Sequence, residues 1–177
     1  LSHLRDKIDR KSTTQRINTP DNIFEQITDL AGVRIILLFQ DDFTIVDRSI
    51  RRKVLSEDWL LEEKPKAFTW DPKTAEFFNK FELDVEQRDT SYTSVHYLIK
   101  PRRGAPICCE LQVRTLFEES WGEIDHKINY PKPTESVSCR EQLKVLSKIV
   151  GAGSRLVDSI QRSLLDESAA EPERGNS

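Results

Sequence analysis

The chain has 177 residues, of which 37% are hydrophobic and 32% are charged, so its length suits one domain and it holds enough apolar side chains for a core. A net charge of −3 and an isoelectric point near 5.7 exclude the strongly basic surface of a general nucleic-acid-binding protein. The odd number of cysteines, three, and the short longest apolar run, 35–39, argue against a disulfide framework and against a membrane span of ~20 residues. We therefore expect a cytoplasmic protein with free thiols and no membrane partner.

Residues 1–56 combine helix patterns with one strand pattern. Apolar spacing predicts a short amphipathic helix in residues 1–16 and a second one after a turn at 19–22. The apolar side chains of the second helix share one face: Ile23, Phe24, Ile27 and Leu30. The run GVRIILLF at 32–39 is rich in branched side chains, which predicts a central strand buried on both faces. A third helix is expected over 43–56.

Residues 80–115 contain three strand patterns. Residues 80–87 alternate between apolar and charged side chains, and the runs YTSVHYLIK (92–100) and ICCELQVRT (107–115) also alternate. A helix is predicted over 116–128, and the prolines that follow it end the helix.

These patterns predict an α+β fold, in which helices surround a mixed sheet of about five strands. We expect the domain to cover residues 1–136, with its N-terminal edge trimmed, because the chain starts at Leu1 and contains no methionine. A long helix predicted over 137–165 either packs on this domain or serves for self-association into a homo-oligomer. Residues 166–177 have the composition of a disordered tail.

Two of the predicted strands have a polar face. Strand periodicity puts three polar side chains of each strand on one side, about 7 Å apart: Tyr92, Ser94 and His96 on the first, and Glu110, Gln112 and Arg114 on the second. If residues 102–106 form a hairpin turn, the two polar faces align. The surface would then hold an aromatic ring, a hydroxyl, an imidazole, a carboxylate and a cation. An ordinary solvated sheet face is the alternative interpretation of this pattern.

Asp29 lies just before the apolar strand, where a core has no use for a carboxylate. Metal-assisted phosphoryl transfer needs oxygen ligands for Mg²⁺, a base near the attacking hydroxyl, and cations near the phosphates. Asp29 and Glu110 are candidates for the ligand and the base, and Arg34 and Arg114 are candidates for the cations. Asp29 is equally well explained as a residue of a helix end or a turn.

Four short motifs follow one another along the chain: TDLAGVRI at 28–35, SYTSVH at 91–96, ELQVRT at 110–115 and WGEIDH at 121–126. Together they resemble the motifs of the RelA/SpoT alarmone synthetase family, over roughly residues 22–130. A single motif of this length is weak, whereas four in the family's order are specific. The resemblance implies a nucleotidyltransferase-like fold.

The resemblance also implies a role for each motif residue. Asp29 would bind Mg²⁺, and Glu110 would bind Mg²⁺ or activate the acceptor 3′-hydroxyl. Tyr92 would stack on the acceptor base, and His96 would contact the acceptor's phosphate or ribose. The other substrate-binding candidates beside them are Ser94, Gln112, Arg114 and Arg34.

The activity implied by the resemblance is transfer of the β,γ-pyrophosphate of ATP to the ribose 3′-hydroxyl of GDP or GTP. The product is (p)ppGpp, the alarmone of the stringent response. The sequence lacks an HD-type pattern of metal-binding histidines, so we expect a synthetase without a hydrolase domain. Two alternatives stay open: a toxin-type relative that pyrophosphorylates the 3′ end of tRNA, and a non-catalytic module that senses nucleotides.

Three departures from the family pattern bear on these alternatives. Ser91 stands where the family has a glycine, which restricts the backbone there. Residues 86–90 replace a basic, proline-containing stretch, with Lys80 and Arg88 as partial substitutes. The family's Arg-x-Lys-Ser element for ATP would align before Leu1 and is missing.

The predicted helix at 116–128 offers another interpretation. Glu119, Glu123 and His126 share one of its faces, and Glu-x-x-His is a ligand spacing of di-iron bundles. Such a site needs a second copy of the motif, which this sequence lacks. We therefore expect His126 to be a buried, hydrogen-bonded residue that supports the sheet.

Overall fold

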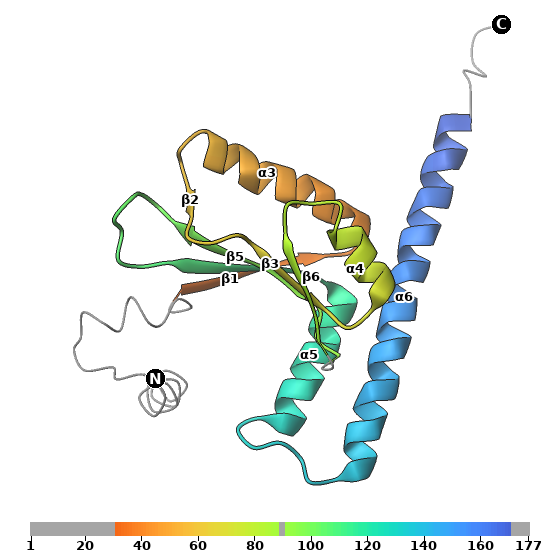
Figure 1. Ribbon diagram of the computed structural model, residues 1–177. Coiled ribbons are helices and arrows are strands. Elements are labelled where there is room, and N and C mark those ends of the chain that lie inside the picture. The colour runs from red at the N-terminus through yellow and green to blue at the C-terminus, as the bar shows by residue number, and fades with distance from the viewer. Residues whose placement is uncertain (1–30, 89–90, 171–177) are drawn as a thin grey trace, which may run out of the picture.

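A computed structural model describes residues 31–88 and 91–170 of the chain. It contains a mixed sheet with helices on both of its faces (Figure 1). The strands are β1 Ala31–Leu37, β2 Leu60–Leu61, β3 Lys66–Thr69, β4 Asp84–Gln87, β5 Ser94–Lys100 and β6 Cys109–Thr115. The helices are η1 Gln40–Asp42, α3 Phe43–Leu55, α4 Pro72–Phe78, α5 Leu116–Asn129 and α6 Val137–Ala170. This is the predicted α+β fold. The elements β2, β3 and α4 are additions, because residues 57–80 have no regular apolar pattern from which the sequence predicted a strand or a helix.

The order of the strands explains how the polar face forms. The strands follow the order β1-β6-β5-β3-β4, and β2 pairs with the last residues of β5. β5 and β6 form the expected antiparallel hairpin, with His96 opposite Gln112 and Leu98 opposite Glu110. β1 runs parallel to β6, which puts Gly32 beside Glu110. Because side chains alternate along a strand, the even-numbered residues of these three strands share one face.

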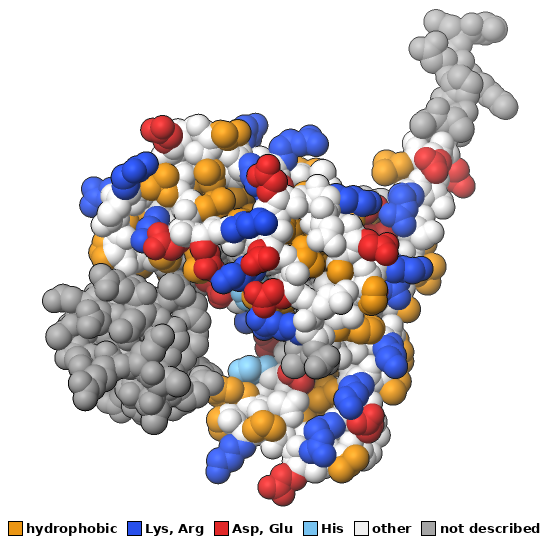
Figure 2. Space-filling model, in the orientation of Figure 1, with side chains coloured by type: hydrophobic (Ala, Val, Ile, Leu, Met, Phe, Trp, Pro, Cys, Tyr) orange, Lys and Arg blue, Asp and Glu red, His pale blue; other side chains and the backbone are white. Residues whose placement is uncertain are grey.

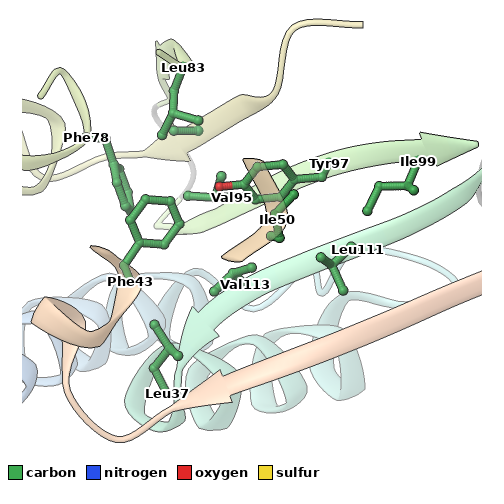
Figure 3. Packing of buried hydrophobic residues seen from close by; sticks show 11 residues of the cluster. Leu37, Phe43, Ile50, Phe78, Leu83, Val95, Tyr97, Ile99, Leu111 and Val113 are labelled. Carbon is green, nitrogen blue, oxygen red and sulfur yellow. The ribbon is translucent and has the colours of Figure 1, made fainter. Parts of the chain in front are cut away.

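The other face of the sheet forms the hydrophobic core, together with α3 and α4 (Figure 3). The odd-numbered residues Val95, Tyr97 and Val113 point into it and are almost fully buried. The Tyr97 hydroxyl donates a hydrogen bond of 2.8 Å to the carboxylate of Asp47 on α3. This buried polar pair is satisfied and ties α3 to the sheet.

The position of β1 differs from the prediction. Among the described strands β1 pairs with β6 alone, so it lies at the edge of the sheet and not at its centre. Leu37 is buried, but Val33 is 50% exposed and Ile36 is 41% exposed. An apolar run cannot distinguish a central strand from an edge strand by itself, because pairing depends on segments far away in the sequence.

The C-terminal helix α6 is longer than predicted. It continues to Ala170, so the segment expected to be a disordered tail, 166–177, is helical over its first part. Those residues include alanine and glutamate, which are good helix formers. The helix packs on α5, where Nε1 of Trp121 donates to the carbonyl oxygen of Leu143 at 3.1 Å. Its outer face carries apolar side chains among lysines and arginines (Figure 2).

The two helices predicted within residues 1–30 lie outside the described residues, and so does Asp29. Within the part of the chain that the structure describes, no helix combines the length and the apolar character needed to cross a bilayer. Cys108, Cys109 and Cys139 are free thiols.

Candidate active site

The polar face of β5 and β6 carries a continuous line of hydrogen bonds. The Tyr92 hydroxyl lies 2.9 Å from Nε2 of His96, and Nδ1 of His96 lies 2.9 Å from Oε1 of Glu110. Nε2 of Gln112 donates to Oε2 of Glu110 at 2.7 Å, and Nη2 of Arg114 donates to Oε1 of Gln112 at 3.2 Å. The structure therefore brings five of the predicted site residues together on one surface.

The hydrogen bonds set the direction of donation from Tyr92 through a neutral His96 ring to Glu110. Burial raises the pKa of Tyr92 above its ordinary value of 10.0, so the hydroxyl keeps its proton at neutral pH and donates it. In a neutral His96 ring, Nε2 is then the acceptor, and Nδ1 carries the proton that bonds to Glu110. One oxygen of the Glu110 carboxylate is oriented by His96, and the other is oriented by Gln112.

Two arginines are held by α5: Arg114, which ends this line, and Arg34, which lies beside it. Nε of Arg114 is 2.7 Å from Oε2 of Glu119. The two groups form an ion pair, but their alignment is not that of a hydrogen bond. Nη1 of Arg34 lies 2.8 Å from carboxylate oxygens of both Glu119 and Glu123. The hydrogen bond with Glu123 raises the pKa of Arg34. Arg114 is buried and Arg34 is half exposed, so the site offers one fixed cation and one accessible cation.

A capping box sets the start of α5 directly after Arg114. The Thr115 backbone N–H donates to the Glu118 carboxylate at 2.8 Å, and the Glu118 N–H donates to the Thr115 hydroxyl at 3.3 Å. The reciprocal bonds satisfy two amide groups that the helix itself leaves unpaired. Burial raises the pKa of Glu118 to about 7.

We expect Glu118→Gln to remove a pH dependence of stability. Because the folded-state pKa is raised from 4.5 to about 7, the protonated form favours folding, and this contribution is lost as pH rises across that window. Glutamine stays neutral and can still complete the capping box. Urea unfolding is measured at a series of pH values. As pH rises to 8, the free energy of unfolding of the variant should increase relative to that of the wild type by up to roughly 3 kcal/mol. The exposed control Glu167→Gln should show no such gain, and parallel pH profiles for wild type and Glu118→Gln would refute the expectation.

A cavity of about 340 Å³ lies between the polar face and α5. Tyr92, Gln112 and Arg114 line it from the sheet, and Gly122 and His126 line it from the helix. Ligand sites commonly occupy ~300–1,000 Å³, so this cavity could hold part of a nucleotide. The hydrogen-bonded line therefore faces a space that a substrate can enter.

His126 is not the buried support that the sequence predicts. It is exposed, and its ring stacks on that of Tyr130, with centroids 4.6 Å apart and planes 13° apart. Side chains four residues apart lie next to each other on a helix, and both rings line the cavity. This spacing of two aromatic residues was the signal that could have placed Tyr130 at the site.

Ser94 is on the predicted face of β5, but it is fully buried. Its hydroxyl donates to the carbonyl oxygen of Val113 at 3.5 Å. Phe68 of β3 stands opposite Ser94 in the neighbouring strand, on the same face of the sheet. In contrast to the prediction, Ser94 has no exposed atom to offer a substrate.

Several residues of the site were missed or undervalued by sequence reasoning. Glu119 and Glu123 hold the arginines, and their spacing on one helix face was the available signal. The guanidinium of Arg88 lies 3.7 Å from the centroid of the Phe68 ring. The Phe68 and His96 rings are nearly perpendicular, with centroids 5.0 Å apart. Arg88 therefore adds a cation on the β3 side of the same face.

One family matches the sequence. The family described as a region found in RelA / SpoT proteins matches residues 1–135, which is most of the chain. A comparison with curated protein sequences gives no match.

Several solved structures of bacterial proteins have a similar fold. Small alarmone synthetase 1 from Bacillus subtilis has a TM-score of 0.68 at 19% identity, over 94% of this chain and 76% of that chain. A GTP pyrophosphokinase family protein from Streptococcus pneumoniae has a TM-score of 0.68 at 17% identity, over 98% and 76%. The Bacillus subtilis synthetase bound to its product pppGpp has a TM-score of 0.65 at 21% identity, over 90% and 74%. These likenesses agree with the described fold and with the family match, and the chain belongs to the RelA/SpoT family.

Proposed function

We propose that this protein is an ATP-dependent pyrophosphokinase that transfers the β,γ-pyrophosphate of ATP to the 3′-hydroxyl of GDP or GTP and so makes (p)ppGpp. Membership of the RelA/SpoT family supports the reaction class. A structural relative with the same fold is described as bound to its product pppGpp. The observation that carries the proposal is the line from Tyr92 to Arg114, in which His96 and Gln112 orient the Glu110 carboxylate. Tyr92, Gln112 and Arg114 of this line also line the cavity beside α5.

The reaction needs a base, a leaving group and charge neutralisation. The 3′-oxygen forms a bond to the β-phosphorus of ATP, the bond from that phosphorus to the α,β-bridging oxygen breaks, and AMP leaves with that oxygen. The proton of the 3′-hydroxyl passes to a base, for which Glu110 is placed, with His96 hydrogen-bonded to it. Arg114 and Arg34 supply positive charge for the phosphate oxygens.

Magnesium fits the chemistry of this site. Mg²⁺ is usually held by one or two carboxylates and completes its shell with phosphate oxygens and water, so it needs no dense protein cluster. Within the described residues no group of three or more potential ligands occurs, which is compatible with such a site. We propose Glu110 and Asp29 as the two carboxylates. When bound, the ion would neutralise charge that develops on the phosphate oxygens.

The acceptor is identified in parallel reactions, each of which contains one candidate. ATP labelled in its β-phosphate is incubated with full-length protein and GDP, GTP or tRNA. We expect AMP release and transfer of label to the guanine nucleotides. Label on tRNA would replace this proposal with that of a tRNA-modifying toxin. Nucleotide binding without any transfer would contradict the proposal and support the alternative of a non-catalytic module that senses nucleotides.

The sensing module is favoured by one sequence feature, Ser91 in place of the family's glycine. Among the described residues, Glu57 is the only non-glycine residue with a left-handed φ, so the backbone at Ser91 adopts a conformation open to serine. This departure therefore costs no strain beside Tyr92, and the catalytic proposal is preferred.

Location and assembly follow from two further features. We propose a cytoplasmic protein, because three free thiols suit a reducing compartment. We also propose a homo-oligomer, because the outer face of α6 exposes a series of apolar side chains: Val145, Ile149, Leu156, Ile160 and Leu164. Light scattering of the full chain decides the second point, and a strictly monomeric mass would contradict it.

We expect Gly122→Ala to impair nucleotide use without destabilising the fold. A Cβ at position 122 would stand 2.8 Å from Nη1 of Arg114, so the guanidinium must move. Alanine is preferred to glycine within a helix by ~1 kcal/mol, which offsets the strain. The Michaelis constant of the nucleotide whose phosphate contacts Arg114 should rise about tenfold, because loss of one charge-assisted hydrogen bond weakens binding by about that factor. Gly151→Ala is the control, since its added Cβ meets Trp70 at an ordinary 3.6 Å. Unchanged kinetics in Gly122→Ala would contradict the role given to Arg114.

A further inference from the structure

An apolar groove is on the face of the sheet opposite the polar line. It is a groove of about 810 Å³ between α3 and the strands β1, β5 and β6, with a lining that is mostly apolar. Ile50, Ile99 and Leu111 form its inner wall (Figure 3). Nearer its mouth, Val33 is 50% exposed, Ile45 is 63% exposed and Ile107 is 43% exposed. An apolar surface of this kind is normally covered.

The chain itself carries a segment suited to this groove. The sequence predicts a helix over 22–30 that has Ile23, Phe24 and Ile27 on one face. Acidic residues at 21, 25 and 29 recur every four positions on the opposite face. Such a helix has one face for an apolar groove and one face for water.

The connection favours this occupant over any other. The segment runs directly into β1, and Ala31, the first residue of β1, is itself part of the groove lining. A tethered segment acts at an effective concentration in the millimolar range, which a second copy or a free ligand rarely reaches. A helix of nine residues is ~14 Å long, shorter than the ~20 Å of the thirteen-residue α3, so it can lie alongside that helix.

We propose that residues 22–30 dock in the groove as a helix, with Phe24 and Ile27 against Val33, Ile45 and Trp59. The groove is then part of the folded core. Docking would bury the apolar side chains of β1 that lie on the same side of the sheet as α3. The opposite face of β1 still carries Arg34 toward the site.

Docking has a consequence for catalysis, and this step rests on the proposed function. Asp29 lies on the helix face opposite Phe24 and Ile27, so docking turns Asp29 away from the groove. It is three residues before Gly32, which pairs with Glu110. The groove therefore acts as a positioning device that holds Asp29 near the start of β1, beside the strand that carries Glu110.

The native cysteines allow a direct test in the full chain. Cys108 and Cys109 both line the groove, so Cys108 and the distant Cys139 on α6 are replaced by serine and Cys109 is the remaining native thiol. Ile27→Cys is then treated with a short bis-maleimide, and cross-linked peptides are mapped by mass spectrometry. We expect an intramolecular link to Cys109 at least tenfold more abundant than in the control Glu25→Cys, which puts the thiol on the acidic face. Equal yields, or links between two chains, would overturn the proposal.

A second measurement covers the case in which a cysteine variant folds poorly. Phe24→Ala combined with Ile27→Ala should keep the circular dichroism of the sheet, shift the emission of Trp59 toward longer wavelength and increase binding of an apolar dye several-fold. The same variant should need a several-fold higher Mg²⁺ concentration for half-maximal transfer. A link to Cys109 in a protein without transfer activity would refute the proposed function and keep the docking. Full transfer activity with no link and no dye binding would refute the docking alone.

Discussion

Glu110→Gln is expected to lower pyrophosphate transfer by several orders of magnitude. The substitution removes the proposed base, which alone is typically worth ~10²–10⁴-fold, and also one of the two proposed carboxylates for Mg²⁺. The change is nearly isosteric, so loss of activity should not reflect loss of the fold.

The hydrogen bonds around Glu110 predict a second, smaller effect of this substitution. His96 and Gln112 each donate to one oxygen of the carboxylate. The amide of glutamine has one oxygen and one donor group, so one of these bonds must be lost, which costs about 1–2 kcal/mol of stability. Steady-state kinetics and thermal unfolding are measured together, with Glu82→Gln as the control, because Glu82 is an exposed partner of Arg51. Near-normal turnover in Glu110→Gln would remove the residue from the catalytic centre.

Tyr92→Ala is expected to raise the Michaelis constant of the acceptor about 5- to 150-fold, with a much smaller effect on ATP. A base stacked on an aromatic ring contributes ~1–3 kcal/mol by alanine substitution. Tyr92 lines the cavity, and its ring lies 5.6 Å from the Arg114 guanidinium, where a phosphate group can be held close to the base. Separate titrations of acceptor and ATP measure the two effects. If Tyr92 only packs in the fold, alanine will lower the melting temperature and affect both substrates alike.

Tyr92→Phe separates the ring from the hydroxyl. From the sequence, phenylalanine is expected to be nearly silent, because the ring does the stacking. The structure adds a hydrogen bond of 2.9 Å from the hydroxyl to Nε2 of His96. We now expect Tyr92→Phe to keep the acceptor's Michaelis constant and to lower kcat several-fold, since His96 loses the bond that orients it. An unchanged kcat would show that this bond has no part in turnover.

The alternation of β5 and β6 was enough to predict the polar face. With a period of two and a short turn between the strands, the side chains of His96, Glu110 and Gln112 had to meet if the strands paired. The same rule could not show that Ser94 is buried, because the residue opposite it, Phe68, belongs to β3. Residues 57–80, which hold β2, β3 and α4, gave no readable pattern, so this neighbour was unknown.

Two other features depended on contacts far apart in the sequence. The apolar run of β1 predicted a central strand buried on both faces, whereas the strand lies at the edge of the described sheet, paired with β6, and most of its residues are exposed. Arg34 and Arg114 were recognised as cations, whereas their common partner Glu119 lies on α5 and is joined to Arg34 only by the fold. Asp29 lies outside the described residues, and its role as a ligand of Mg²⁺ stays a prediction.

Phosphorus-31 NMR of the full-length protein with ATP, GDP and Mg²⁺ tests the central claim most directly. As the ATP signals decline, the spectrum should gain AMP and a 3′-diphosphate on the guanine nucleotide in equal amounts, and the same mixture with Glu110→Gln should stay unchanged over that period. Release of ADP and inorganic phosphate, or ATP signals that persist in the presence of each guanine nucleotide, would contradict pyrophosphate transfer by this protein.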